Sequence, residues 1–169
     1  QMDLLPLVRK GYNLNSYKLD NVSANFITGP VIKIDYNEND NTSIIYTKST
    51  MGLNNKNFVM FKIQDGYLEN KYMDGAKFVI NNLNKELNCF TVNKKINLDV
   101  IQDCSWCLGK DDVTPKDIFR LQTGDSHDRY IIAQYCMMDV ILCIELLNKL
   151  EILTNNIGMA NVCKNPLSW

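Results

Sequence analysis

Apolar positions near the beginning of the chain recur at helical spacing. Leu19, Val22 and Phe26 lie three and four residues apart, so a helix would place them on one face. Gly29-Pro30 follows, a pair that ends helices because proline cannot continue the hydrogen-bond ladder. We therefore predict a helical segment within residues 1–28.

A different pattern, of short runs rich in β-branched and aromatic residues, fills residues 29–109. Turn-forming sequences such as Asp65-Gly66 and Asp74-Gly75 separate these runs. Several short strands at close spacing are typical of a small antiparallel sheet or barrel. The predicted strands cover residues 31–34, 43–47, 57–63, 77–80 and 89–92.

Helical periodicity returns over residues 110–169. Thr114-Pro115 is typical of a helix start, because threonine caps free amide groups and proline fits the first turn. A long helix is expected from residue 127 to 153, and a short one over residues 156–163. With helices at both ends and strands between them, the chain is predicted to have an α+β fold.

Composition and charge limit the classes of protein that fit this pattern. The 169 residues are 46% hydrophobic and 22% charged, which is enough for a packed core. The net charge is −1, without the basic excess of a free-standing nucleic-acid-binding protein. There is no run of about 18 apolar residues that would predict a membrane span, and the N-terminus lacks a signal-peptide pattern. Both ends of the sequence look as though they were cut from a longer chain.

Six cysteines bear on the redox environment. Cys136, Cys143 and Cys163 lie in apolar, helix-like sequence. This setting predicts buried thiols and not a disulfide framework, because free cysteine behaves as a small apolar side chain. The sequence therefore favours a reducing compartment.

A zinc site is the alternative use of the other cysteines. Cys104 and Cys107 are spaced as a metal-binding pair, and Cys89 could be a third ligand. A structural zinc site takes four ligands, normally as two pairs, and the chain has a single histidine, His127, in a different context. We therefore favour two cysteines packed beside Trp106, and a surface or capping role for His127.

A tyrosine and an aspartate lie one turn apart in the predicted long helix. Tyr135 and Asp139 are at positions i and i+4, on the side that carries apolar residues. An inward carboxylate is costly unless it is paired, hydrogen-bonded or bound to a metal ion. In two-metal phosphodiester hydrolysis, carboxylates hold two cations about 4 Å apart, and a neighbouring phenol can orient a water molecule. The pair alone also fits a helix with Asp139 at its polar edge.

Four segments around this pair resemble family B DNA polymerases, in the order found in that family. Residues 14–26 are similar to the stretch that follows the second exonuclease motif, and residues 110–119 to the stretch before the third. Residues 129–139 resemble the third motif itself. Residues 156–169 are similar to the exit toward the polymerase palm. The sequence looks most like the delta-like polymerases of eukaryotes and large DNA viruses.

The resemblance implies the later part of a ribonuclease-H-like 3′→5′ proofreading exonuclease domain, without its first strands. Asp139 would be a ligand of a catalytic Mg²⁺ or Mn²⁺, and Tyr135 would orient the attacking water or the scissile phosphate. Arg129 would meet phosphate or help the helix to dock, with a capping or surface role as the alternative. The family's first motif and the aspartate of its second have no counterpart in the sequence, so the chain alone is expected to be inactive.

Residues 29–109 are predicted to be an inserted β-rich module, since the family usually joins the flanking segments by a shorter loop. This division leaves residues 1–28 and 110–169 as exonuclease-domain segments. The module could bind a processivity factor, bind DNA or have no role of its own. A different class of function stays open as well: a non-catalytic scaffold or partner-binding module of a replication protein.

The resemblance also implies partners and a location. The partners would be the primer 3′ end, the template and the rest of the polymerase chain, without a membrane. The location would be intracellular and reducing, in the nucleus or in a cytoplasmic viral factory.

Overall fold

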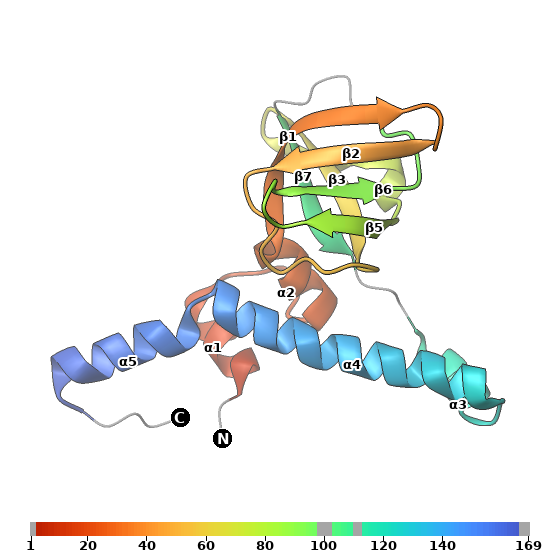
Figure 1. The fold of residues 1–169 in the computed structure, drawn as a ribbon. Coiled ribbons are helices and arrows are strands. Elements are labelled where there is room, and N and C mark those ends of the chain that lie inside the picture. The colour runs from red at the N-terminus through yellow and green to blue at the C-terminus, as the bar shows by residue number, and fades with distance from the viewer. Residues whose placement is uncertain (1–2, 98–102, 110–112, 166–169) are drawn as a thin grey trace. The chain divides into compact units, whose positions relative to one another are not determined.

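The computed structural model describes residues 3–97, 103–109 and 113–165, and its fold mixes helices with an antiparallel sheet (Figure 1). The chain divides into two compact units. The first, here called the helical unit, combines Gln1–Val22 with Asp111–Trp169, and the second, the barrel unit, is Ser23–Lys110. Each unit is described separately below.

The barrel unit contains all the strands that the structure describes. Five of them coincide with the five predicted strand runs, so those predictions are confirmed, whereas β4 and β7 were not predicted. The elements are β1 (Thr28–Asn37), β2 (Thr42–Thr47), β3 (Phe58–Asp65), β4 (Leu68–Lys71), the 3-10 turn η1 (Tyr72–Gly75), β5 (Phe78–Asn84), β6 (Cys89–Val92) and β7 (Cys104–Gly109).

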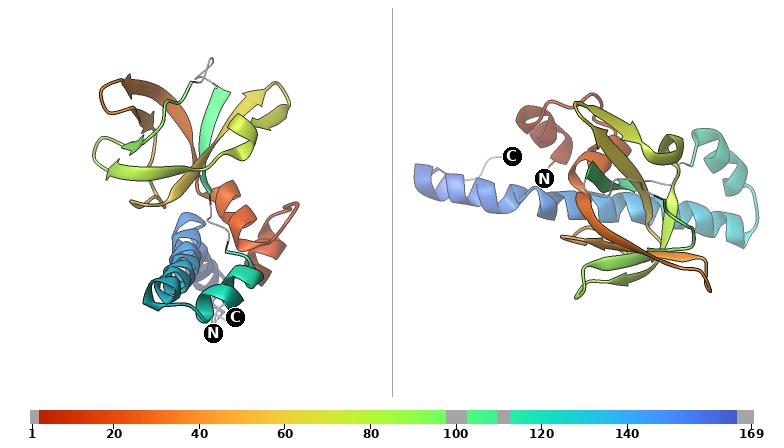
Figure 2. Two further views of the ribbon diagram at one scale, coloured as in Figure 1. Left: turned by 90° about the vertical axis from the view of Figure 1, so that its right-hand side faces the viewer. Right: turned by 90° about the horizontal axis from the view of Figure 1, so that it is seen from above.

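The antiparallel strands close into a barrel. Their order around it is β1-β2-β6-β5-β3-β7, and β7 pairs back with β1 (Figures 1 and 2). Closure leaves these six strands paired on both sides, which removes the exposed edges that an open sheet would present. The short strand β4 extends β3 as a hairpin outside this ring, so the Asp74-Gly75 turn joins β4 to β5 without making a hairpin of them.

Irregular registers let two strands turn the corners of the barrel. In β1, residues 28–30 pair with β7, and from Val31 onward the strand pairs with β2, with a register shift between Val31 and Lys33. In β5, the shift falls between Ile80 and Asn82, and the strand changes its partner from β3 to β6. Bulges of this kind bend and twist a strand, which allows a small sheet to close. Gly29 and Pro30 therefore lie inside a strand and not, as predicted, at the end of a helix.

Trp106 on β7 is the centre of the barrel core. Its side chain is 1% exposed, and its ring meets Phe90 edge to face at 6.1 Å between centroids. The indole nitrogen donates a hydrogen bond of 2.7 Å to the Thr47 hydroxyl, which itself donates to the carbonyl of Pro30 at 2.8 Å. Gly29 lies against the ring so closely that an added Cβ would be 2.9 Å from the indole nitrogen. The core thus combines apolar burial with satisfied polar groups.

The remaining core residues come from all sides of the barrel. Alternation along the strands sends every second side chain inward, as the pleat requires. The side chains that are fully inaccessible to solvent include Ile27, Ile45, Val59, Phe61, Ile80, Phe90 and Val92.

The helical unit contains helices from both ends of the chain. Helix α1 was not predicted; its start is capped by Asp3, whose carboxylate accepts a hydrogen bond from the Leu5 amide at 3.0 Å. Helix α3 begins as predicted, with Pro115 in its first turn and a reciprocal pair of hydrogen bonds between Thr114 and Asp117. The elements are α1 (Leu4–Gly11), α2 (Leu19–Phe26), which ends in the barrel unit, α3 (Pro115–Gln122), α4 (Ser126–Lys149) and α5 (Ile152–Cys163).

The predicted long helix is interrupted. It ends at Lys149, and the last helix begins at Ile152, four residues before its predicted start. The break is at Glu151, whose backbone is left-handed at φ +48°. Because neither glycine nor proline marks this position, the sequence pattern did not reveal the break.

Helix α4 is apolar around most of its circumference. By length and composition alone it could cross a membrane, contrary to the sequence expectation, although a single helix of this kind is weak evidence. An unbroken apolar run is absent because Asp139 and Glu145 interrupt it. Helices that are apolar on all sides are typical of membranes or of the interior of a large protein.

Candidate functional site

Tyr135 and Asp139 are both on helix α4, one turn apart. The helix start is fixed by Asp125, whose carboxylate accepts a hydrogen bond from the Asp128 amide at 2.9 Å. Both candidate side chains are half-buried. Leu142 and Leu146 continue the same face of the helix and are buried, at 2% and 3% exposed. The structure thus brings the two candidates together on the inward side of α4, which we call the Asp139 face.

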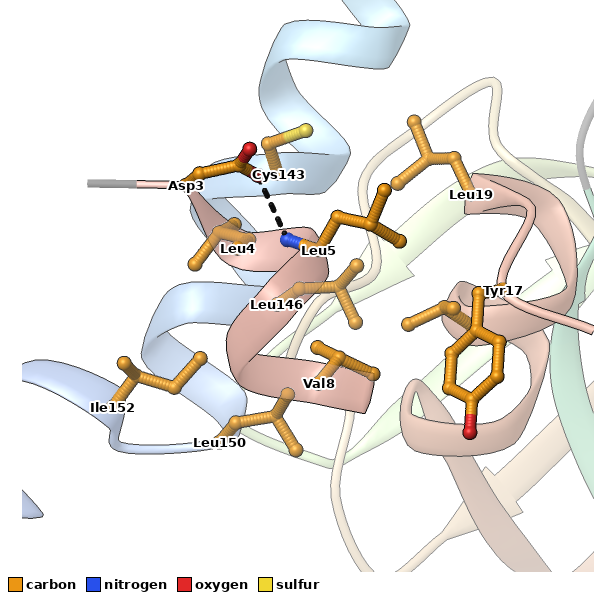
Figure 3. A pocket seen from close by; sticks show the side chains of 11 residues that line it. Asp3, Leu4, Leu5, Val8, Tyr17, Leu19, Cys143, Leu146, Leu150 and Ile152 are labelled. Atoms are coloured by element: carbon orange, nitrogen blue, oxygen red, sulfur yellow. Dashed lines mark hydrogen bonds between the residues drawn. The ribbon is translucent and has the colours of Figure 1, made fainter. Parts of the chain in front are cut away.

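An apolar groove begins one turn beyond Asp139. Its volume is about 480 Å³, and it lies between α1 and the second half of α4 (Figure 3). Aliphatic side chains of both helices point into it, and Asp3 and Tyr17 contribute the polar atoms. The other lining residues are Leu4, Leu5, Val8, Leu19, Val22, Cys143, Leu146, Leu150 and Ile152.

The sequence reasoning missed this groove because it did not recognise α1. The signal was present: Asp3 is a helix cap before the apolar run that begins at Leu4. Pro6 concealed it, although proline is tolerated in a first helical turn.

Asp139 does not meet enough other ligands to hold a metal ion. Among the residues that the structure describes, no three His, Cys, Asp or Glu side chains are grouped closely enough to bind one. A two-metal site needs several carboxylates. The described part of this chain therefore does not form the implied Mg²⁺ or Mn²⁺ site by itself, and Asp139 could be no more than one of its ligands.

Arg129 and His127 lie at the beginning of α4, away from Asp139 along the helix. The guanidinium of Arg129 is exposed and donates a hydrogen bond of 2.9 Å to the carbonyl of Gly124, which stabilises the turn between α3 and α4. The His127 ring is exposed and stacks on Tyr130 at 6.4 Å between centroids. The surface role predicted for His127 is confirmed.

The burial predicted for the three helical cysteines is wrong. Cys136, Cys143 and Cys163 are exposed, whereas Cys89 and the β7 pair are buried, and all six are free thiols. The prediction failed because the helices that carry the first three are apolar on more than one side, so an apolar neighbourhood in sequence did not mean burial.

The buried cysteines are unsuited to zinc. Cys104 and Cys107 are three residues apart on β7, and side chains at odd spacing point to opposite faces of a strand. Burial raises the pKa of the Cys89, Cys104 and Cys107 thiols, which disfavours the thiolate that zinc requires. Both observations disfavour metal binding. By the same alternation, Cys104 shares the face of Trp106 and Cys107 lies on the opposite face, so the predicted packing of both cysteines beside Trp106 is correct for Cys104 at most.

Comparison with known proteins finds relatives among viral DNA polymerases. No family profile matches the chain. The DNA polymerase of Pyramimonas orientalis virus is 38% identical over 99% of the chain, and that of Phaeocystis pouchetii virus is 35% identical over 99%. This likeness over nearly the whole chain supports its assignment as a segment of a family B DNA polymerase of a large DNA virus. The chain spans only 12% and 16% of the length of these two relatives, so it corresponds to one segment of such a polymerase.

A delta polymerase matches a smaller part. The catalytic subunit of DNA polymerase delta from Mesocricetus auratus is 40% identical over 60 residues, 36% of the chain. A match of that length is shorter than the barrel unit, Ser23–Lys110, whereas the two viral matches extend across it. The barrel is therefore part of the likeness to the viral polymerases, and the matched part of the delta subunit cannot contain all of it.

Proposed function

We propose that this chain contributes Asp139 and Tyr135 to the 3′→5′ proofreading exonuclease of a family B viral DNA polymerase. The observation that supports this most directly is their position. They lie one turn apart and half-buried on the face of α4 that continues into Leu142 and Leu146. A carboxylate on an apolar, inward face is unusual outside functional sites.

The chemistry would be phosphodiester hydrolysis at the 3′ end of a DNA primer. Reactions of this class use two divalent cations, here Mg²⁺ or Mn²⁺, held by several carboxylates. Asp139 would supply one ligand, and the phenol of Tyr135 would orient the attacking water or the scissile phosphate. The other carboxylates would come from the polymerase chain beyond this sequence, in a ribonuclease-H-like domain to which the helical unit belongs. The isolated chain would then be inactive.

The same proposal implies a cellular location and a role for Arg129. Six free thiols suit an intracellular, reducing location, in the nucleus or a cytoplasmic viral factory. Contact of Arg129 with DNA stays a prediction, and its hydrogen bond to Gly124 supports the capping alternative.

The test uses the full-length polymerase with Asp139→Asn. Excision of a mispaired 3′ nucleotide should fall at least about 100-fold, as for loss of a metal-site ligand, while nucleotide incorporation stays near the parent rate. Tyr135→Phe should reduce excision less, by about tenfold, since it removes only a positioning hydroxyl. Glu145→Gln, another carboxylate of α4 but on a different side, is the matched control. Unchanged excision by the Asp139 variant would refute the proposal.

A second function, partner binding by the barrel, is favoured by the hairpin of β3 and β4. Tyr67 and Leu68 at its tip are 105% and 70% exposed, and Met73 in the following turn is 52% exposed. Neighbouring exposed apolar side chains at the tip of a hairpin, here Tyr67 and Leu68, are typical of protein contact sites. We propose that this tip contacts a processivity factor. Replacing Tyr67 and Leu68 with serine should shorten synthesis with the factor present and leave excision unchanged; unaltered processivity would refute it.

A further inference from the structure

Helix α4 has a second apolar surface, distinct from the Asp139 face. It consists of Tyr130, Ala133, Met137, Val140 and Ile144, here called the outer stripe. These side chains are exposed, the four large ones at 55–60%. At about 100° per residue, the stripe and the Asp139 face lie on roughly opposite sides of the helix. Two opposed apolar sides explain why α4 is apolar enough to pass for a membrane helix.

The spacing of the outer stripe suits a helix as its neighbour. Its residues follow one another at intervals of three, four, three and four, which is the seam of helices that pack at a shallow angle. From Tyr130 to Ile144 the seam is about 21 Å long, at 1.5 Å per residue. A partner helix of four turns would therefore cover it.

Two other occupants fit the residues less well. A bilayer would have to accept Asp139 and Glu145 in the middle of the helix, which is costly. In a second copy paired through a two-stranded coiled coil, charged residues normally flank the seam. Here the flanking positions between Arg129 and Asn148 are uncharged: Gln134, Cys136, Ile141 and Cys143.

We propose that an apolar helix of the same polymerase chain, from outside residues 1–169, packs along the outer stripe. Most of the length of the viral relatives lies outside their match to this chain, so such a segment is available in the same polypeptide. Tethering gives a segment of the same chain an effective concentration of about millimolar, which favours it over a separate partner. Helix α4 would then lie in the interior of the polymerase, covered on both the Asp139 face and the outer stripe. This holds whether or not Asp139 is catalytic.

Methionine oxidation tests this proposal with native residues. Met137 in the outer stripe is 60% exposed and Met73 in the barrel unit is 52% exposed, so dilute peroxide should oxidise both at similar rates in the isolated chain. In the full-length polymerase, oxidation of Met137 should slow at least about tenfold relative to Met73, because susceptibility follows exposure. Equal oxidation of both residues in the full-length protein would overturn the proposal. Protection of Met137 in the isolated chain would overturn the proposal too. This holds if the protection is the same at every protein concentration, if it increases with concentration as for a second copy, or if it needs lipid vesicles as for a bilayer.

A pair of matched substitutions adds a second measurement. Val140→Glu places a charge in the outer stripe, and Val79→Glu places the same charge on the barrel surface, where Val79 is 39% exposed. The stripe variant should leave the thermal midpoint of the isolated chain unchanged but lower that of the full-length polymerase by about 5 °C or more. The barrel variant should change neither. Equal midpoints for both full-length variants would contradict the proposal.

Discussion

The two units differ in how far each completes its own structure. In the barrel unit, six strands are paired on both sides and Trp106 lies in a core with side chains fully shielded from water. The buried Ser43 hydroxyl is satisfied inside the barrel: it donates to the Lys94 carbonyl at 2.7 Å and accepts from the Ile96 amide at 3.0 Å.

The helical unit buries fewer apolar side chains and leaves more of them exposed. Its buried apolar side chains are few: among the described residues, Val8, Val22, Leu121, Leu142, Leu146 and Ile152. Large apolar residues of α4 and α5 are exposed, with Val162 at 83% and Met159 at 65%. A groove stays open beside α1. The candidate site shows the same incompleteness, since the described residues contain no group of three His, Cys, Asp or Glu side chains that could hold a metal ion at Asp139. From this comparison we propose that the barrel is a module by itself and that the helices belong to a larger domain.

Producing the two units separately tests this difference between them. Residues 23–110 alone should fold cooperatively, because closure and core lie within them. Residues 3–22 joined to 113–165 should instead remain partly unfolded, since their apolar surface is uncovered. Dispersed amide spectra and a sharp urea transition would identify the folded unit. A monomeric helical unit with its own cooperative transition would contradict the comparison.

Trp106→Ala should cause the largest loss of stability by a single substitution. It removes a fully packed indole and leaves the Thr47 hydroxyl without its donor, so the barrel should lose about 3–5 kcal/mol. Hydrogen exchange of barrel peptides, measured in the whole chain, would report the loss. A barrel that retains its protection would show that the core is less dependent on β7 than the contacts indicate.

Leu146→Ala should cost less, although Leu146 is also buried. Its side chain faces a groove that is already open, so the cavity penalty is small and the loss should be near the lower limit of about 2 kcal/mol. Exchange of α4 peptides is the measurement. In the full-length polymerase the same change should cost more, if another segment fills the groove there; equal losses in the two contexts would argue against that filling.

Acid should weaken the start of α3 by a small amount. Hydrogen bonds from the Thr114 hydroxyl and amide hold the pKa of Asp117 below its ordinary value of 3.8. A lowered pKa in the folded state means that this carboxylate stabilises the helix above pH 3.8 and that the stabilisation disappears as the pH falls through the folded value. Exchange of α3 peptides should therefore accelerate below that pH. In Thr114→Ala, which keeps the amide hydrogen bond but loses the hydroxyl, the acceleration should be smaller.

The sequence predicted the helices and strands whose conformation depends on neighbouring residues. Five strands and the start of α3 were correct because alternation and capping are written in neighbouring residues. Strand β7 was missed because Cys104–Gly109 has little strand pattern, and its conformation depends on pairing with distant β1 and β3. Strand β4 is exposed along its length, so it lacks an alternation to detect.

The site was predictable only in part for a related reason. Tyr135 and Asp139 share a turn of one helix, so their spacing was sufficient to bring them together. The break at Glu151 and the exposure of Cys136 depend on contacts that local periodicity does not encode.

The most direct test is a cleavage assay of the isolated chain on single-stranded DNA labelled at its 3′ end, with Mg²⁺ or Mn²⁺, beside Asp139→Ala. The account predicts no cleavage by either protein, because one carboxylate cannot hold two metal ions. Cleavage by the parent chain that disappears in the Asp139 variant would mean that the site is complete within these residues. That result would contradict the conclusion that the helical unit needs the rest of the polymerase.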